Sequence, residues 1–214
     1  MKRERWENRV TLTGEAVREP DFSHSRGGED FFTFPLRCRR LSGTEDVLNV
    51  VVSRTVLEKT DIRAGCRLSL EGEVRSYNNR SGSGSRLVVT VRAVRVAPAR
   101  GDGDGNLVRL TGNLCRRPVY RHTPLGREIT DLLLAVNRRS GRADFLPCVT
   151  WGGMARRAAC WETGERVRLW GRLQSRPYLK TLNGTAVERI AYEVSAMKIE
   201  RIPAEPGGNE TVKI

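Results

Sequence analysis

The stretch Asn8-Arg9-Val10-Thr11-Leu12-Thr13-Gly14 returns 98 positions later as Asn106-Leu107-Val108-Arg109-Leu110-Thr111-Gly112. The same offset, or one residue more, also relates the following pairs: Pro20 and Pro118, Phe22 and Tyr120, His24 and His122, Arg40 and Arg138, Gly72 and Gly171, Ser76 and Ser175. Solenoid periods run roughly 20–50 residues, so a repeat this long indicates a duplicated domain. We therefore expect two domains, residues 6–98 and 106–203, with a flexible acidic linker at 99–105 and a disordered tail at 204–214.

The charge of the chain favours a nucleic-acid partner. The 214 residues include 38 Lys and Arg against 25 Asp and Glu, a formal net charge of +13. The excess lies mainly in residues 106–203, and nearly all the basic residues are Arg, whose planar fork suits phosphates and stacking on bases. General solubility is the alternative interpretation of the same charge.

The cysteines argue against a metal or disulfide framework. Their number is odd and no pair has C-x-x-C spacing: Cys38, Cys66, Cys115, Cys148 and Cys160. We expect buried, reduced thiols and no metal or cofactor. The sequence has no long apolar run, which indicates a cytoplasmic, nucleoid-associated protein without membrane contact.

Alternating apolar and polar residues predict five strands in each half, with one short helical turn between the third and fourth. The strands of the first half are expected at 10–18, 31–40, 47–53, 66–77 and 86–96, with a helical turn at 56–61 and a mobile Gly/Ser-rich loop at 78–85. Those of the second half are expected at 107–115, 128–138, 144–151, 164–178 and 187–199, with a helical turn at 154–160 and a turn at 182–184. This plan predicts an all-β chain of two tandem five-stranded OB-fold barrels. Glycines inside the first and fourth strands (Gly14, Gly112, Gly72 and Gly171) predict the bulges or bends that barrel closure needs.

Strand parity separates the two faces of the third strand of the second half. Leu146, Cys148 and Thr150 are expected to point into the barrel, and Phe145, Pro147, Val149 and Trp151 to point outward. In the fourth strand the outward set is Arg172, Gln174, Arg176 and Tyr178.

The second half resembles bacterial single-stranded DNA-binding protein. The motifs that carry the resemblance follow one another in order: Leu110-Thr111-Gly112, Arg116-Arg117-Pro118, Arg121-His122-Thr123-Pro124-Leu125-Gly126, Leu133-Leu134-Ala135-Val136-Asn137-Arg138-Arg139, Asp144-Phe145-Leu146-Pro147-Cys148-Val149-Thr150-Trp151-Gly152, and Val167-Arg168-Leu169-Trp170-Gly171-Arg172-Leu173-Gln174-Ser175-Arg176 with Tyr178. The first half matches more faintly, through the repeat. The resemblance implies OB-folds that bind single-stranded DNA in sets of four, so a two-domain chain is expected to form a homodimer.

The resemblance also implies which residues contact DNA. Sequence-tolerant binding of single strands needs a basic groove and aromatic side chains on which bases stack. Phe145, Trp151 and Tyr178 fall where the family uses aromatic residues for stacking. The phosphate candidates of the second half are Arg116, Arg117, Arg138, Arg139, Arg172, Arg176 and Lys180. Trp170 is expected to meet either DNA or a neighbouring subunit, and Trp161 to cover the core.

The first half departs from this pattern. Val47 stands opposite Phe145 in the repeat and Ser53 opposite Trp151, while Tyr77 is the one aromatic candidate near the place of Tyr178. The basic candidates that remain are Arg39, Arg40, Arg75 and Arg80, beside Arg37 and Arg86. We expect either a weaker DNA site or a half retained mainly for pairing with the second domain.

Two other classes of function compete. An enzyme is disfavoured because His24 and His122 have no carboxylate cluster or cysteine partner, and the chain contains no P-loop and no G-x-G-x-x-G motif. The second class is an OB-fold module of the primosomal replication type, which binds DNA weakly and bridges helicase or primase partners. The end of the chain, Asn209-Glu210-Thr211-Val212-Lys213-Ile214, lacks the acidic tail through which the family recruits replication and repair proteins, so such partners stay open.

Overall fold

The computed structural model describes residues 7–79, 87–182 and 185–203, and is built almost entirely of strands. The elements of the first half are β1 (Asn8–Ala16), β2 (Asp21–Arg26), β3 (Glu29–Arg39), β4 (Glu45–Ser53), α1 (Arg54–Leu57), β5 (Arg67–Asn78) and β6 (Leu87–Pro98). Those of the second half are β7 (Gly105–Leu114), β8 (Val119–His122), β9 (Glu128–Asn137), β10 (Ala143–Trp151), α2 (Gly152–Ala158), β11 (Arg166–Leu182) and β12 (Thr185–Arg201).

Each half closes into a five-stranded barrel. In the first half the strands pair in the cyclic order β1-β3-β4-β6-β5 and back to β1; in the second the order is β7-β9-β10-β12-β11 and back to β7. The pairing is antiparallel except between β4 and β6 and between β10 and β12. The short helix follows the third barrel strand in both halves, which is the OB-fold plan expected from the sequence.

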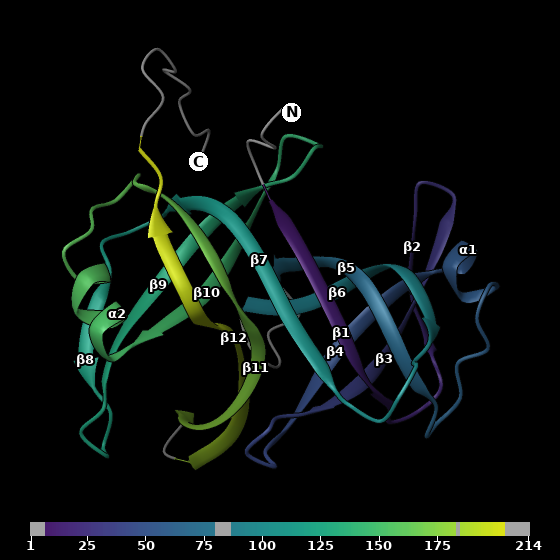
Figure 1. Ribbon diagram of the computed structural model, residues 1–214. Helices are drawn as coiled ribbons and strands as arrows, with labels where there is room; N and C mark the ends of the chain where they lie inside the picture. Colours follow the sequence, from purple (N-terminus) through teal and green to yellow (C-terminus); the bar gives the residue numbers. More distant parts are fainter. Residues whose placement is uncertain (1–6, 80–86, 183–184, 204–214) are drawn as a thin grey trace.

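The two barrels share one continuous sheet, because β1 and β7 pair along their length (Figure 1). Val10 faces Val108, its own counterpart in the repeat, so a local two-fold axis passes through this pair. Both valines are fully buried, and apolar side chains of both halves form one connected core. The duplication has therefore produced a pseudo-symmetric molecule rather than two independent units.

The linker expected to be flexible is held in place, which corrects that expectation. Asp104 accepts a hydrogen bond from the Arg39 backbone N–H at 2.6 Å and pairs with the Arg67 guanidinium at 2.7 Å. Arg67 also donates to the carbonyl oxygens of Asp102 and Gly103. Periodicity could not reveal these contacts, because the partners of the linker lie 35 to 65 positions away in the sequence.

Other differences from the expected plan are small. The segments read as loops after the first strands contain short strands, β2 and β8, that form hairpins with β3 and β9. Both helices begin two residues earlier than predicted, at Arg54 and Gly152. Residues 80–85 of the loop expected at 78–85, residues 183–184 of the turn expected at 182–184 and the whole tail expected at 204–214 lie outside the described residues. Arg80, Arg86 and Trp6 lie outside them too.

Two of the four strand glycines occupy bulges, as predicted. The register between β11 and β12 shifts at Trp170/Gly171, and that between β5 and β6 shifts at Glu71/Gly72. A Cβ on Gly171 would overlap the carbonyl oxygen of Ser195 on the neighbouring strand. Only a residue without a side chain permits this close approach of two backbones. The residue that each bulge leaves unpaired, Val94 or Met197, projects to the surface.

Cys38 and Cys148 lie buried in the two barrels, as predicted. Burial raises the pKa of the Cys38 thiol to about 12 and that of the Cys148 thiol well above its ordinary range. Because the thiolate is the reactive form, these two residues act as apolar core residues. In contrast, Cys160 is exposed. Among the described residues no helix has the length and apolar character needed to span a membrane.

Candidate nucleic-acid interface

The outer face of β10 carries two of the predicted stacking residues. Phe145 is 42% exposed and Trp151 is partly exposed, while Leu146, Cys148 and Thr150 are buried inside the barrel. The parity prediction is therefore confirmed for these five residues. An aromatic ring held outward on a rigid strand can stack with a base of any sequence, because every base presents a π-face.

Val149 was expected on the outer face of β10 but is buried. It lies between its cross-strand neighbours Asp131 on β9 and Ser195 on β12. Asp131 is held by Arg121, and Ser195 accepts a hydrogen bond from Trp151 Nε1 at 3.1 Å. These side chains cover Val149. The same hydrogen bond fixes the orientation of the Trp151 indole against β12, so Trp151 has a structural contact as well as a partly exposed face.

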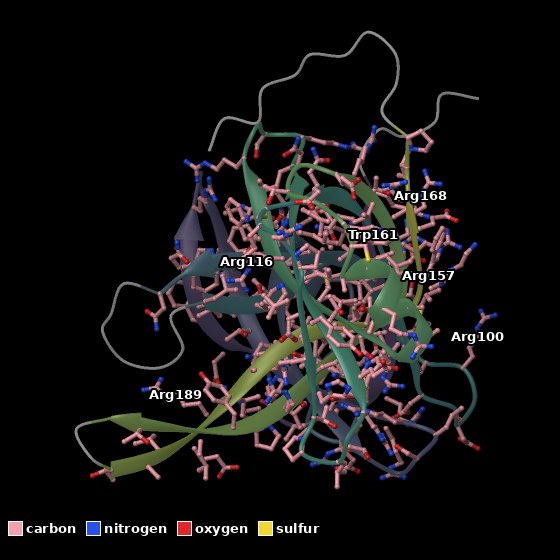
Figure 2. The ribbon with its side chains drawn as sticks, turned by 90° about the vertical axis from the view of Figure 1, so that its left-hand side faces the viewer. Arg100, Arg116, Arg157, Trp161, Arg168 and Arg189 are labelled. Carbon is pink, nitrogen blue, oxygen red and sulfur yellow. The ribbon has the colours of Figure 1, made fainter. Side chains whose placement is uncertain are left out.

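Tyr178 lies on a long arm formed by β11 and β12, opposite Arg189. The arm projects from the body of the molecule, and Arg189 is labelled on it in Figure 2. Arg176 and Leu179 on the arm are exposed, whereas Gln174 at its base is buried and donates to Glu193. The outward set predicted for this strand is thus correct except for Gln174. Arg189 was not among the sequence candidates.

Most phosphate candidates of the second half are accessible at the surface, but one of them is bound to a buried carboxylate. Arg116 and Arg139 are exposed, and Arg172 is partly exposed. Arg117 pairs with Glu162 at 2.8 Å and Arg176 approaches Glu193 at 3.7 Å, yet both remain largely exposed. Arg138 is different, because both arms of its guanidinium bind the fully buried Asp144. The side chain of Lys180 lies outside the described residues.

The described basic candidates of the first half are all paired with carboxylates. Arg39 pairs with Glu45, and Arg37 with Glu15 and Glu45. Arg40 binds the fully buried Asp46 through both arms, and Arg75 binds Glu73 and Asp144. A guanidinium already engaged with a carboxylate offers less to a phosphate. The structure therefore places the guanidiniums of Arg40, Arg75 and Arg138 against buried carboxylates. From the sequence, these three residues were expected on the DNA-binding surface.

The remaining aromatic residues take distinct positions. Trp161 packs against the core, as predicted. Trp170 lies on the outer face of the joined sheet, with Lys198 Nζ 4.7 Å and the Arg168 guanidinium 5.9 Å from its ring centroid. Phe34 is fully buried in the first barrel.

Sequence reasoning missed Phe22, which is 61% exposed near the start of β2, opposite Phe32 on β3. Its ring meets the edge of Phe32, and Arg54 lies over Phe32 at 5.3 Å from the ring centroid. Tyr120 occupies the equivalent exposed position in the second half. The repeat does pair Phe22 with Tyr120, so two aromatic residues stand at equivalent positions. No strands were expected there from the sequence, however, so there was no reason to expect rings that are held outward.

A groove of about 510 Å³ lies where the second barrel meets the first. Its walls are the start of β1 and the middle of β5 and β6 on one side, and Asn137, Arg138 and Arg139 on the other. The acidic side chains on the first wall are engaged: Glu73 with Arg75, Glu71 with Arg95 and Glu7 with Arg109. Within the described part of the chain, no group of His, Cys, Asp and Glu is arranged to hold a metal ion.

Comparisons with known proteins agree with the fold. A model of the single-strand binding protein family matches residues 105–202. The crystal structure of wild-type single-stranded DNA binding protein from Thermus aquaticus superimposes with a TM-score of 0.77 at 26% identity, over 96% of this chain and 98% of that chain. Residues 105–202 thus match the single-strand binding protein family, and the fold of the whole chain is similar to that of the Thermus protein. The resemblance inferred from sequence motifs is therefore confirmed, and so is the tandem OB-fold architecture.

The curated relatives differ in how much of this chain they match. The Thermus aquaticus protein is 26% identical over 235 residues, which cover 94% of this chain and 88% of that protein. Single-stranded DNA-binding protein A of Bacillus subtilis is 36% identical over 110 residues, 48% of this chain and 62% of that protein. The chain thus spans less than two thirds of the length of the Bacillus protein, and the alignment covers about half of the chain.

Proposed function

We propose that this protein binds single-stranded DNA without sequence readout and protects it during replication, recombination or repair. The observation that carries the proposal is the outward placement of Phe145 on β10, 42% exposed, beside the partly exposed Trp151 in a barrel of this family. Relatives from Bacillus and Thermus are named single-stranded DNA-binding proteins. The protein acts as a binder rather than as an enzyme, in the cytoplasm on nucleoid DNA.

The second barrel supplies most of the binding surface. Phe145, Trp151 and Tyr178 provide stacking faces, worth about 1–3 kcal/mol for each base. The exposed or partly exposed arginines of the same barrel contact the phosphates: Arg116, Arg117, Arg139, Arg172 and Arg176. The first barrel contributes fewer charges, since its described candidates are paired with carboxylates.

The active assembly is a homodimer with four OB-folds. Support comes from the outer face of the joined sheet, where exposed apolar residues gather near the local two-fold axis. Leu107 is 40% exposed and Met197 is 58% exposed, while Trp170 lies on the strand next to β7. Exposed apolar patches on soluble proteins mark interaction surfaces. A second copy of the chain, with the same pseudo-symmetric sheet, presents a matching surface.

The first test of the proposal is a titration of the protein with poly-dT, followed by tryptophan fluorescence. We expect strong quenching and a site of tens of nucleotides. Phe145→Ala leaves all four tryptophans in place and should weaken binding, and Trp151→Ala should do the same. The matched control is Val47→Ala, at the position equivalent to Phe145 in the first barrel, which should bind like the wild type.

The same titration, repeated at several salt concentrations, tests the electrostatic part. The logarithm of the affinity should fall linearly with the logarithm of salt, by roughly 0.7 for each phosphate neutralised. An affinity that does not respond to salt would contradict phosphate binding by the arginines. Weak binding with negligible quenching would instead favour a module that bridges helicase or primase partners.

A further inference from the structure

The two barrels meet at two equivalent contacts, which we name after the buried carboxylate at the centre of each. The Asp144 seam consists of Asp144 and Arg138 from the second barrel and of Arg75 and Ser76 from the first. The Asp46 seam consists of Asp46 and Arg40 from the first barrel and of Ser175 from the second. The offset of the repeat relates the carboxylate, the arginine and the serine of one seam to those of the other.

At the Asp144 seam, the carboxylate is fully buried and joins the two barrels. It accepts hydrogen bonds from Arg138 at 2.5 and 2.8 Å, from Arg75 at 2.9 Å and from the Ser76 backbone N–H at 2.7 Å. The Phe145 backbone N–H donates to Ser76 Oγ at 2.8 Å. The backbone that carries Phe145 is therefore anchored to the residue that precedes Tyr77.

At the Asp46 seam the carboxylate, the arginine and the serine meet again, while Gln174, which stands at the position of Arg75 in the repeat, donates to Glu193 instead. Asp46 accepts hydrogen bonds from Arg40 at 2.6 and 2.7 Å and from the Ser175 backbone N–H at 2.8 Å. Here the serine hydroxyl lies 3.2 Å from Asp46 Oδ1 and donates to it. The Asp46 seam holds the barrels together in the same way, but its serine hydroxyl is directed to the carboxylate rather than to the neighbouring backbone.

The side chains around the two seams differ in chemistry. Beside the Asp144 seam stand two exposed rings, Tyr77 (56% exposed) and Phe145 (42% exposed), and two exposed guanidiniums in the β9–β10 turn, Arg139 and Arg142. The repeat places the following residues at the equivalent positions of the Asp46 seam: Arg176, Val47, Leu41 and Thr44. Leu41 is fully exposed there. The Asp144 seam thus carries two exposed rings and two exposed guanidiniums, drawn from both barrels, whereas the four equivalent positions of the Asp46 seam carry one guanidinium and no ring.

We propose that the Asp144 seam is a composite binding site for single-stranded DNA, shared by the two barrels. Neighbouring bases of one strand stack on Tyr77 and Phe145, and Arg139 and Arg142 hold the phosphates between them. The proposal rests on the proposed function and names the part of the surface where the strand crosses from one barrel to the other. Ser76 is a positioning residue, because its hydroxyl fixes the backbone of Phe145 relative to Tyr77.

The first test compares Tyr77→Ala with Phe145→Ala in binding to a short oligo-dT. Each change should weaken binding about 5- to 150-fold, the range that corresponds to loss of one stacked base. Val47→Ala at the Asp46 seam is the control and should bind like the wild type. An oligo-dT with one 5-iodouracil, irradiated on the wild-type protein, should crosslink to peptides that contain Tyr77 and Phe145.

The outcomes separate this proposal from the proposed function. If Tyr77→Ala binds like the wild type while Phe145→Ala binds weakly, the second barrel binds DNA alone and the composite site is wrong. If neither change affects binding and the wild type binds tightly, both the seam and the aromatic part of the proposed function fail. Tyr77 and Phe145 are exposed, so thermal unfolding should show that both variants remain folded.

The positioning role of Ser76 has its own matched control. Ser76→Ala and Ser175→Ala each remove one serine hydroxyl from a seam and should lower the unfolding temperature to a similar degree. Only Ser76→Ala should also weaken oligo-dT binding, because only that hydroxyl anchors the backbone of a stacking residue. Equal affinities of the two variants would show that Ser76 is merely structural.

Discussion

Asp144 shows how one residue decides the role of its neighbours. Its buried carboxylate binds Arg138 and Arg75 and caps the Ser76 backbone N–H. Asp144→Ala leaves two partly buried guanidiniums without their counter-charge and should cost about 3–5 kcal/mol of unfolding free energy, measured by urea denaturation. Asp21→Ala, which removes the exposed partner of Arg18, is the control and should leave stability nearly unchanged. Equal effects of the two changes would contradict a structural role for the seam.

At the scale of the element, the bulge in β11 depends on Gly171. A Cβ at this position would overlap the Ser195 carbonyl oxygen of β12, so Gly171→Ala forces the two strands apart. Overpacking of this kind costs about 1–3 kcal/mol, which chemical denaturation would measure. Gly103→Ala is the matched control, because a Cβ on Gly103 meets no atom within 4 Å. A Gly171→Ala variant as stable as Gly103→Ala would show that the bulge can relax without cost.

At the scale of the whole molecule, the joined sheet should form the dimer interface. Light scattering coupled to gel filtration should give twice the chain mass of 24.1 kDa. Met197→Glu places a charge on the exposed apolar face and should shift the protein toward the monomer, since burying an unpaired charge at an interface is costly. Leu179→Glu, on the projecting arm away from the joined sheet, is the control and should stay dimeric. A monomeric wild type would overturn the four-barrel assembly.

The amino-acid sequence by itself determined the duplicated barrel plan, the glycine bulges and the outward placement of Phe145. These follow from repeat spacing and from alternation along a strand, which are local properties of the chain. Only the tertiary structure decided that Arg40, Arg75 and Arg138 bind buried carboxylates and that the linker is anchored. It also decided that Tyr77 and Phe145 stand at the same seam. The physical reason is distance along the chain. Ser76 and Asp144 lie 68 positions apart, and Asp46 and Ser175 lie 129 apart, so each carboxylate completes its set of hydrogen bonds only when β1 and β7 have joined the two barrels.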